Sequence, residues 1–401
     1  MKNKIAQHLE VIKENVVDLI SEEELTSKLE NSFKNNKPLK LKIGFDPTAR
    51  DIHLGHTVLL RKLRKLQDLG HHVYFIIGDF TAKIGDPSGK STLRPVLTDK
   101  QIKSNAATYT TQAFKILDKK KTTVIYNSIW YKKMGLDKFL SILSSYTIAR
   151  VLERDDFSRR IKQGKPLTLL EMIYPLIQGY DSYKMEADIE FGGTDQKFNL
   201  IVGRHLQQSF GQESQAIVTM PILVGLDGKN KMSKSLNNYI GITDSPKDMF
   251  GKLMSISDDV MWEYFKLLRD SDGEIFKKIH PKEAKLTLAQ QIVCFYHSAK
   301  VAAREREEFD KVFSKGNLPE DMPQYRAKTK VIDIIEVLYD SNLVPSKNEA
   351  RRLLTQGSIS IIDPANPRNA EVVKDQKIEL HEQGGVLKVG KKRFLKLISP
   401  K

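Results

Sequence analysis

The chain has 401 residues, of which 40% are hydrophobic and 29% charged, with a mean hydropathy of -0.40. This length allows two or three globular domains, and no apolar run approaches the ~20 residues that a membrane-spanning helix needs. The 65 Lys and Arg residues exceed the 50 Asp and Glu residues, and the formal charge of +15 favours a polyanionic partner without proving one.

The first segment, MKNKIAQHLEVIKENVVDL, is predicted to form a charged amphipathic helix, and it lacks the apolar core and cleavage site of a secretory signal. The single cysteine, Cys294, cannot form an internal disulfide, so a reducing compartment suits the chain. We therefore expect a cytoplasmic protein.

A parallel sheet is predicted in the first half of the chain. Alternating apolar residues in PLKLKIGFD (38–46) indicate a strand, leucines at helical spacing indicate a helix that ends before Gly70, and the apolar run HVYFIIGD (72–79) indicates a second strand. A strand, a helix and a strand with short joints predict a right-handed crossover in a parallel sheet. Further strands of this sheet are expected at 122–127, 187–193 and 215–223.

The pattern becomes helical after about Asn238. Ser245-Pro246 and Ser257 are helix-start signals, and Pro281 is expected to open another helix. The polar stretch 314–330 holds two prolines and shows no period, so it is expected to be a linker. The prediction is a Rossmann-type α/β domain (1–235), then an α-helical domain (236–325) and a small α+β domain (331–401).

The loop IGDPSGKST (84–92) looks at first like the phosphate-binding P-loop of a kinase or ATPase. The motif G-x-x-x-x-G-K-S/T would need glycine where Ile84 stands, and Pro87 removes one amide from the cradle. A P-loop is therefore disfavoured. The loop is expected at the carboxyl edge of the sheet, where Asp86 can receive an ammonium group.

Two further motifs suit a nucleotide. His53 and His56 stand three residues apart at the start of the first predicted helix, where unsatisfied amides attract phosphate, and Gly55 leaves room for a flat ring. Structural histidines or a metal site are the alternatives. In KNKMSKS (229–235), three lysines follow a DG turn. They form either a solvated charged surface or a flexible loop that closes over a polyphosphate.

Together, HLGH and KMSKS resemble the two signatures of class I aminoacyl-tRNA synthetases. The order of GFDPTARDIHLGH, IGDPSG, YPLIQGYD, GGTDQ and KMSKS is similar to bacterial tyrosyl-tRNA synthetases, and the resemblance covers nearly the whole chain. It implies an enzyme that converts L-tyrosine and ATP to tyrosyl-adenylate and pyrophosphate and then charges the 3′ end of tRNA(Tyr). It also implies Mg²⁺ as a cofactor, a homodimer with contacts between about Lys119 and Arg160, and an anticodon-side role for the helical domain. Neither DNA, nor a membrane, nor a protein-bound metal is expected as a partner.

The resemblance assigns roles to individual residues. The catalytic residues are expected to be His53, His56, Lys231 and Lys234. The residues expected to bind ATP are Asp46, His53, Gly55, His56, Asp195, Gln196, Lys231, Met232, Ser233 and Lys234. The residues expected to bind tyrosine are Gly44, Asp86, Tyr174, Gln178, Asp181 and Gln196.

Within the tyrosine site, the resemblance gives the α-ammonium group to Asp86, Tyr174 and Gln178, and the phenol hydroxyl to Asp181. The last three lie four and three residues apart and so share one helical face, although a polar stripe on a surface helix would show the same spacing. A buried acid that needs a hydroxyl rejects phenylalanine, so no editing domain is expected.

Lys42 departs from the usual pattern, because many tyrosyl synthetases carry a tyrosine at this position that contacts the substrate phenol. The chain is similar in this respect to a subgroup of the bacterial enzymes. By strand alternation Lys42 shares a face with Gly44 and Asp46. It is therefore expected either to be displaced outward or to pair with Asp181.

The terminal module (331–401) resembles a small RNA-binding fold shared with a small-subunit ribosomal protein and pseudouridine synthases. Its Lys347, Arg351 and Arg352 are expected to contact RNA phosphates from one helix, against the alternative of an ordinary solvated helix. Two rival functions stay open. A tryptophanyl synthetase would share both signatures, but Asp181 and the terminal module favour tyrosine. A synthetase-derived RNA-binding protein without catalysis is disfavoured by the retained histidines and lysines.

Overall fold

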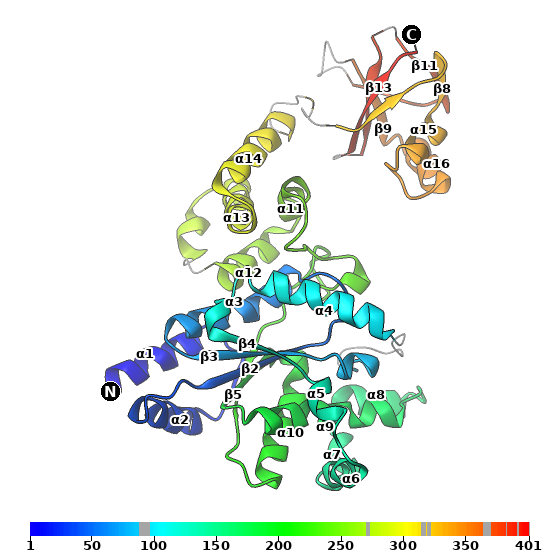
Figure 1. Cartoon of the computed structure of the whole chain (residues 1–401). Coiled ribbons are helices and arrows are strands. Elements are labelled where there is room, and N and C mark those ends of the chain that lie inside the picture. Colours follow the sequence, from blue (N-terminus) through cyan, green and yellow to red (C-terminus); the bar gives the residue numbers. More distant parts are fainter. Residues whose placement is uncertain are drawn as a thin grey trace. The chain divides into compact units, whose positions relative to one another are not determined.

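The computed structural model describes residues 1–87, 97–269, 273–313, 318, 322–363, 370–381, 383–390 and 393–400 (Figure 1). It divides into two compact units, Met1–Ile292 and Val293–Lys401. The finer division into three domains stays a prediction. Part of the IGDPSGKST loop, from Ser88 onward, lies outside the described residues.

The first unit is built on a six-stranded sheet of order β1-β6-β5-β2-β3-β4, with β1 antiparallel to β6 and the other neighbours parallel. Its strands are β1 (Asp18–Ile20), β2 (Lys40–Phe45), β3 (His72–Ile77), β4 (Thr122–Tyr126), β5 (Ile189–Gly193) and β6 (Ala216–Met220). The five parallel strands confirm the predicted sheet, whereas the short β1 was not predicted. The strand order reverses beside β2, and open α/β sheets bind ligands at the carboxyl edge of such a reversal.

Helices cover both faces of this sheet, with α3 and α4 on one face and α9 and α10 on the other (Figure 1). The helices are α1 (Lys2–Lys13), α2 (Glu22–Lys34), α3 (Leu54–Asp68), α4 (Asp99–Ala113), α5 (Ser128–Tyr131), α6 (Leu136–Ser144), α7 (Ile148–Val151), α8 (Asp155–Lys162), α9 (Leu169–Met185), α10 (Lys197–Ser209), α11 (Pro246–Leu253), α12 (Asp258–Leu268) and α13 (Pro281–Tyr296).

Local sequence explains where several of these helices begin and how closely they pack. The side chains of Ser245 and Ser257 accept the backbone hydrogen bonds that start α11 and α12, as the cap signals predict. The helices α9 and α10 meet at two glycines. A Cβ on Gly179 would lie 2.9 Å from the backbone nitrogen of Gly203, so only glycine allows this close approach.

The second unit holds a five-stranded sheet of order β10-β9-β12-β13-β7 and a two-stranded sheet of β11 and β8. Its elements after α13 are α14 (Ala299–Phe313), β7 (Gln324–Arg326), β8 (Val331–Asp333), α15 (Ile334–Asp340), α16 (Lys347–Thr355), β9 (Ile359–Ile362), β10 (Ala370–Val372), β11 (Lys377–Glu379), β12 (Gly385–Val389) and β13 (Arg393–Ile398). Apolar residues of α15, α16 and the strands form one buried core, as an α+β module requires.

The prediction that residues 314–330 form a linker without regular structure is wrong for residues 324–326. Residues Gln324–Arg326 form β7, which pairs in parallel with β13. A three-residue edge strand is too short to show a period in the sequence, so only its partner reveals it.

In the described residues, no helix is both long enough and apolar enough to cross a bilayer.

Candidate functional site

A cavity of about 420 Å³ opens beside the carboxyl ends of β2, β3 and β5. It is lined by every residue that the sequence predicted to bind ATP or tyrosine, from Gly44 and Asp46 after β2 to Lys231 and Lys234 of the lysine motif. Its volume lies within the range of small-molecule sites. The site therefore forms at the strand-order reversal, where the parallel sheet predicts it.

Backbone pairing brings the histidine and lysine motifs together across about 180 residues of sequence. The chain after the lysine motif pairs with the segment that leads into α3, because the backbone N–H of Leu54 donates to the Ile240 oxygen at 3.0 Å. The N–H of Ile242 donates to the Ile52 oxygen, also at 3.0 Å. Both motifs consequently face one cavity.

The two histidines are neutral hydrogen-bonding groups in this site. The backbone N–H of His53 donates to Nδ1 of His56 at 3.2 Å, so the hydrogen of the neutral His56 ring is on Nε2. Burial, with the charge of Lys234, lowers the pKa of His56 to about 3. Burial also lowers the pKa of His53 well below its ordinary value, helped by His56 and by Lys234. Both rings can donate hydrogen bonds to phosphate oxygens without carrying a charge.

The lysine motif supplies the positive charge. Asp227 holds the preceding turn by accepting from the backbone N–H groups of Lys229 and Asn230 at 3.0 and 2.9 Å. Lys231 forms an ion pair with Asp195 of the GGTDQ motif, with 2.8 Å between Nζ and Oδ2. Lys234 donates to the backbone oxygen of Asp51, and burial lowers the pKa of Lys234 to about 8.

One end of the cavity is organised by Asp46. Tyr174 on α9 donates its hydroxyl hydrogen to Oδ2 of Asp46 at 2.8 Å, and Thr81 donates to Oδ1 at 2.6 Å. A Cβ on Gly78 would lie 2.1 Å from Oδ1 of Asp46, so a larger residue at position 78 would displace this carboxylate. Tyr174 is thereby fixed with its oxygen beside the cavity.

Asp181 lies at the buried end of the cavity, held by side chains that the sequence did not single out. Its Oδ1 accepts from Nε1 of Trp130 at 2.9 Å and from the hydroxyl of Tyr131 at 2.7 Å. Its Oδ2 accepts from Nδ2 of Asn127 at 3.1 Å. Burial raises the pKa of Asp181 to about 6, although nearby Lys42 and these three donors oppose that rise.

Asn127, Trp130 and Tyr131 were missed although one signal pointed to them. They follow β4 directly, and the carboxyl ends of parallel strands meet at one edge of a sheet. The sequence interpretation used this region only for subunit contacts and core packing, so its polar side chains were not tested against that rule.

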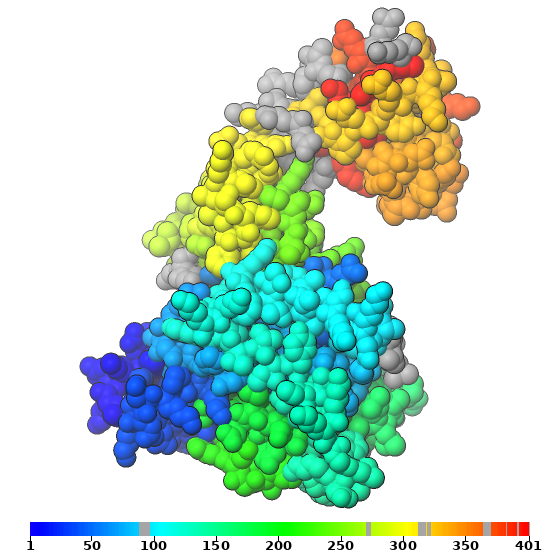
Figure 2. All heavy atoms as spheres, in the orientation of Figure 1, coloured from blue at the N-terminus to red at the C-terminus, as the bar shows by residue number. Residues whose placement is uncertain are grey.

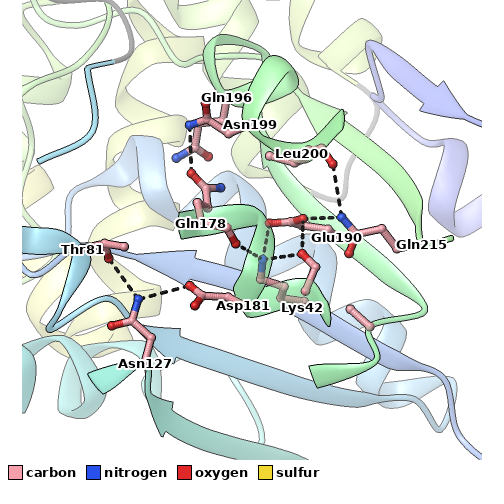
Figure 3. A network of polar contacts seen from close by, with 12 residues as sticks. Lys42, Thr81, Asn127, Gln178, Asp181, Glu190, Gln196, Asn199, Leu200 and Gln215 are labelled. Carbon is pink, nitrogen blue, oxygen red and sulfur yellow. Dashed lines mark hydrogen bonds and ion pairs between the residues drawn. The ribbon is translucent and has the colours of Figure 1, made fainter. Parts of the chain in front are cut away.

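Lys42 corrects both sequence expectations. Its side chain is 1% exposed, so it is not displaced outward. Its Nζ donates to Glu190 Oε1 at 2.7 Å, to Ser182 Oγ at 2.7 Å and to the Gln178 backbone oxygen at 3.3 Å (Figure 3). An ammonium group has three hydrogens, and these bonds use all of them. The partner of Lys42 is therefore Glu190 and not Asp181, which senses only its charge.

The predicted RNA-contacting residues lie together on α16 in the second unit. Lys347 pairs with Glu336 at 2.6 Å, Arg352 pairs with Glu349 at 2.7 Å, and Arg351 donates to the side chain of Asn348. Exposed ion pairs of this kind contribute little stability, so phosphates can displace the acids.

No group of three or more His, Cys, Asp or Glu side chains in the described part of the chain is placed to hold a metal ion. The carboxylates beside the cavity are instead engaged with protein donors. Asp46 accepts from Tyr174 and Thr81, and Asp195 pairs with Lys231.

Comparison with known proteins agrees with this arrangement. Residues 34–314 match the family profile described as tRNA synthetases class I (W and Y), and residues 314–397 match the Tyrosine--tRNA ligase SYY-like C-terminal domain. The chain is 48% identical to the tyrosine--tRNA ligase of Aquifex aeolicus over 398 residues, which cover 98% of this chain and 99% of that protein. It is 49% identical to that of Oleidesulfovibrio alaskensis over 402 residues, with 98% of each chain covered.

A solved structure of tyrosyl-tRNA synthetase complexed with L-tyrosine from Archaeoglobus fulgidus shares the fold. Its TM-score is 0.59 at 23% identity, and the match covers 75% of this chain and 99% of that one.

Proposed function

The chain belongs to the tyrosine--tRNA ligases of the class I synthetase family, and from this membership we propose how its residues divide the work. The enzyme activates L-tyrosine with ATP to tyrosyl-adenylate and transfers the tyrosyl group to tRNA(Tyr). One observation carries the residue roles: the two histidines, the two lysines and Asp181 line a single cavity.

At the ATP end, His53 and His56 donate neutral hydrogen bonds to phosphate oxygens at the start of α3, where the helix amides add their own attraction. Lys231 and Lys234 neutralise the charge that develops on the leaving pyrophosphate. Lys231 must exchange its Asp195 partner for the phosphates, which frees Asp195 to accept from a ribose hydroxyl. The remaining predicted ATP contacts, with Gly55, Gln196, Met232 and Ser233, line the same cavity.

Mg²⁺ fits this site as an ion that arrives on the triphosphate, since a hard cation of this kind binds phosphates with few protein ligands. In that position it would neutralise phosphate charge. Among the described residues there is no group of carboxylates placed to hold it, and Asp195 is paired with Lys231.

At the tyrosine end, Asp181 accepts the phenol hydrogen. Trp130, Tyr131 and Asn127 aim the carboxylate and offset part of the cost of burying its charge. Phenylalanine would leave this polar site without a partner. We assign the ammonium group of the substrate to Asp86, Tyr174 and Gln178, which line the same cavity.

A homodimer is proposed from an unusual set of exposed apolar side chains. Leu136 is 70% exposed and Ile148 is 67% exposed, and they belong to a larger set in the same segment. The set consists of Tyr126, Ile129, Leu136, Leu140, Ile148, Ile161, Leu169 and Leu170. Figure 2 shows the teal-to-green segment that carries them at the surface. Exposed apolar surface marks interfaces, and this set overlaps the predicted Lys119–Arg160 region.

The proposed RNA contact uses α16, on which Arg351 and Arg352 are exposed and Lys347 is partly exposed. The cytoplasmic location also stays a proposal, based on the single cysteine and on the reaction itself.

The decisive experiment is pyrophosphate exchange into ATP, run with each amino acid separately. Exchange is expected with tyrosine, and phenylalanine should fail because it cannot hydrogen-bond Asp181. Exchange driven by tryptophan, or by no amino acid, would overturn the residue roles given above.

A further inference from the structure

The ammonium group of Lys234 lies against an aromatic ring that is outside every motif of the sequence. Lys234 Nζ is over the ring of Tyr109 on α4, 5.7 Å from the ring centroid. Tyr109 is 3% exposed and lines the cavity together with Lys234. A cation within about 6 Å of a ring centroid is attracted by the electrons of the ring face, most strongly where water is excluded. The contact therefore joins α4 to the lysine motif at the cavity wall.

The ring of Tyr109 is itself held by two neighbouring rings. Its centroid is 6.4 Å from the ring of Phe45 at an interplanar angle of 82°, and 6.4 Å from the ring of His56 at 56°. Phe45 is the last residue of β2, and His56 belongs to the first turn of α3. A buried ring packed in this way has few other rotamers, so Tyr109 is a fixed surface for the flexible lysine side chain.

The contact leaves hydrogens of Lys234 available for phosphate. An ammonium group has three hydrogens. Within the part of the chain that the structure describes, Lys234 donates one of them, to the backbone oxygen of Asp51, and forms no ion pair with a carboxylate. The ring attracts the charge but has no lone pair that would occupy a hydrogen. Lys231, in contrast, must leave the carboxylate of Asp195 before it can bind a phosphate.

We propose that Tyr109 is a positioning residue, which holds the ammonium group of Lys234 at the phosphate end of the cavity for the activation step. The inference rests on the proposed function, because Tyr109 acts through the leaving-group role of Lys234. A lysine side chain loses rotamer freedom when it is fixed, and the ring offsets part of that loss before ATP binds. The ring also favours the charged form of Lys234, whereas burial opposes it and lowers the pKa to about 8.

Removal of the ring, with and without Lys234, tests this role in the full-length protein. Tyr109→Leu keeps an apolar side chain at the buried position but loses the ring face. In tyrosine-dependent pyrophosphate exchange, kcat/KM for ATP should fall about threefold to thirtyfold, the range for a cation–π contact, while the Kd for tyrosine stays unchanged. Tyr109→Phe keeps the ring face and should retain most of the activity. In a Lys234→Ala background, Tyr109→Leu should have no further effect, because the group that it positions is gone.

The pH profile gives a readout that a merely structural role would not move. The charged and titratable groups that act on Lys234, or on the histidines beside it, are Asp51, His53, His56 and Lys231. Burial keeps both histidines neutral above about pH 7, so an alkaline decline does not belong to them.

The direction of the expected shift follows from the charge of Lys234. Loss of the ring should lower the pKa of Lys234 below about 8, so in Tyr109→Leu the alkaline decline of kcat/KM for ATP should move to lower pH. The threefold to thirtyfold range corresponds to about 0.5–1.5 pH units. Tyr109→Phe has no phenol that could ionise and should keep the wild-type decline.

Tyr239→Leu is the matched control, because Tyr239 makes the same kind of contact with a different lysine. Lys252 Nζ lies 5.1 Å from the ring centroid of Tyr239. The control should change neither kcat/KM for ATP nor its alkaline decline. A melting curve for each variant identifies one that has lost its fold, and Tyr109→Met then replaces Tyr109→Leu.

Opposite outcomes overturn the inference. A loss in Tyr109→Leu that is equally large in the Lys234→Ala background would make the ring merely structural, and so would an alkaline decline that does not move. Wild-type protein that shows no tyrosine-dependent exchange would instead refute the proposed function, so the two failures are distinguishable.

Discussion

Replacing Lys42 by methionine tests whether the buried Lys42–Glu190 pair organises the tyrosine end of the site. Both side chains are almost fully buried, at 1% and 2% exposure. The change removes a charge while keeping an unbranched side chain of similar length. Glu190 keeps hydrogen bonds from Ser182 and Gln215, but its charge loses its counterion.

The expected cost follows from that uncompensated charge. Breaking a buried ion pair by removing one partner costs about 3–5 kcal/mol, and the two remaining donors to Glu190 place this case near 3 kcal/mol. A unit of this size loses roughly 2–4 °C of melting temperature per kcal/mol, so Lys42→Met should melt about 6–12 °C lower. The KM for tyrosine should also rise, because Lys42 holds Gln178 and Ser182 of α9 in place.

Two further proteins complete the test, which is read by thermal unfolding and by tyrosine-dependent pyrophosphate exchange. In Lys42→Met/Glu190→Gln neither member of the pair carries a charge, so most of the lost stability should return. Lys40→Met is the matched control, because Lys40 lies on the same strand and pairs with the exposed Glu186, a contact worth at most about 1 kcal/mol. Equal losses in Lys42→Met and Lys40→Met, or no recovery in the double variant, would refute the reasoning.

Four other predictions concern the reaction and the assembly. Burial raises the pKa of Asp181 to about 6, so its carboxylate is protonated below that pH. In a pyrophosphate-exchange profile, kcat/KM for tyrosine should therefore fall as the pH drops from about 7 to 5. A profile without this fall would mean that the phenol of the substrate does not bind Asp181. Lys234→Ala should slow adenylate formation in single-turnover assays far more than it weakens tyrosine binding, and equal effects would remove Lys234 from the leaving-group role. In the wild-type protein, burial lowers the pKa of Lys234 to about 8, so kcat/KM for ATP should decline above that pH as the ammonium group loses its proton. Leu136→Asp/Ile148→Asp should give a monomer by light scattering if these exposed residues form the subunit contact, whereas Leu236→Asp, an equally apolar exposed site outside the set, should leave the assembly unchanged.

Patterns between neighbouring residues were sufficient to predict several helices and strands. The alternation in β2, the leucine spacing in α3 and the serine caps of α11 and α12 all predict structure from neighbours a few residues apart. The histidine and lysine motifs likewise named residues that line the cavity, because a helix start and a lysine-rich turn are local signals for a phosphate site.

Contacts between residues that are distant in sequence could not be predicted from these short-range patterns. The strand β7 is visible only through its pairing with β13, and β1 only through β6. The donors around Asp181 lie about fifty residues before it in sequence. Strand alternation gave the face of Lys42 correctly, but it could not choose among acids that approach that face from other elements.

The sequence by itself named residues that line the cavity and predicted the parallel sheet that supports them, because motifs and hydrophobic periods are local properties of the chain. The tertiary structure alone decided the partners: Glu190 for Lys42, Asp46 for Tyr174 and Asn199 for Gln178. The physical reason is that each buried charge or amide must satisfy its hydrogen bonds with whatever the packed elements bring within about 3 Å, and that set exists only after folding.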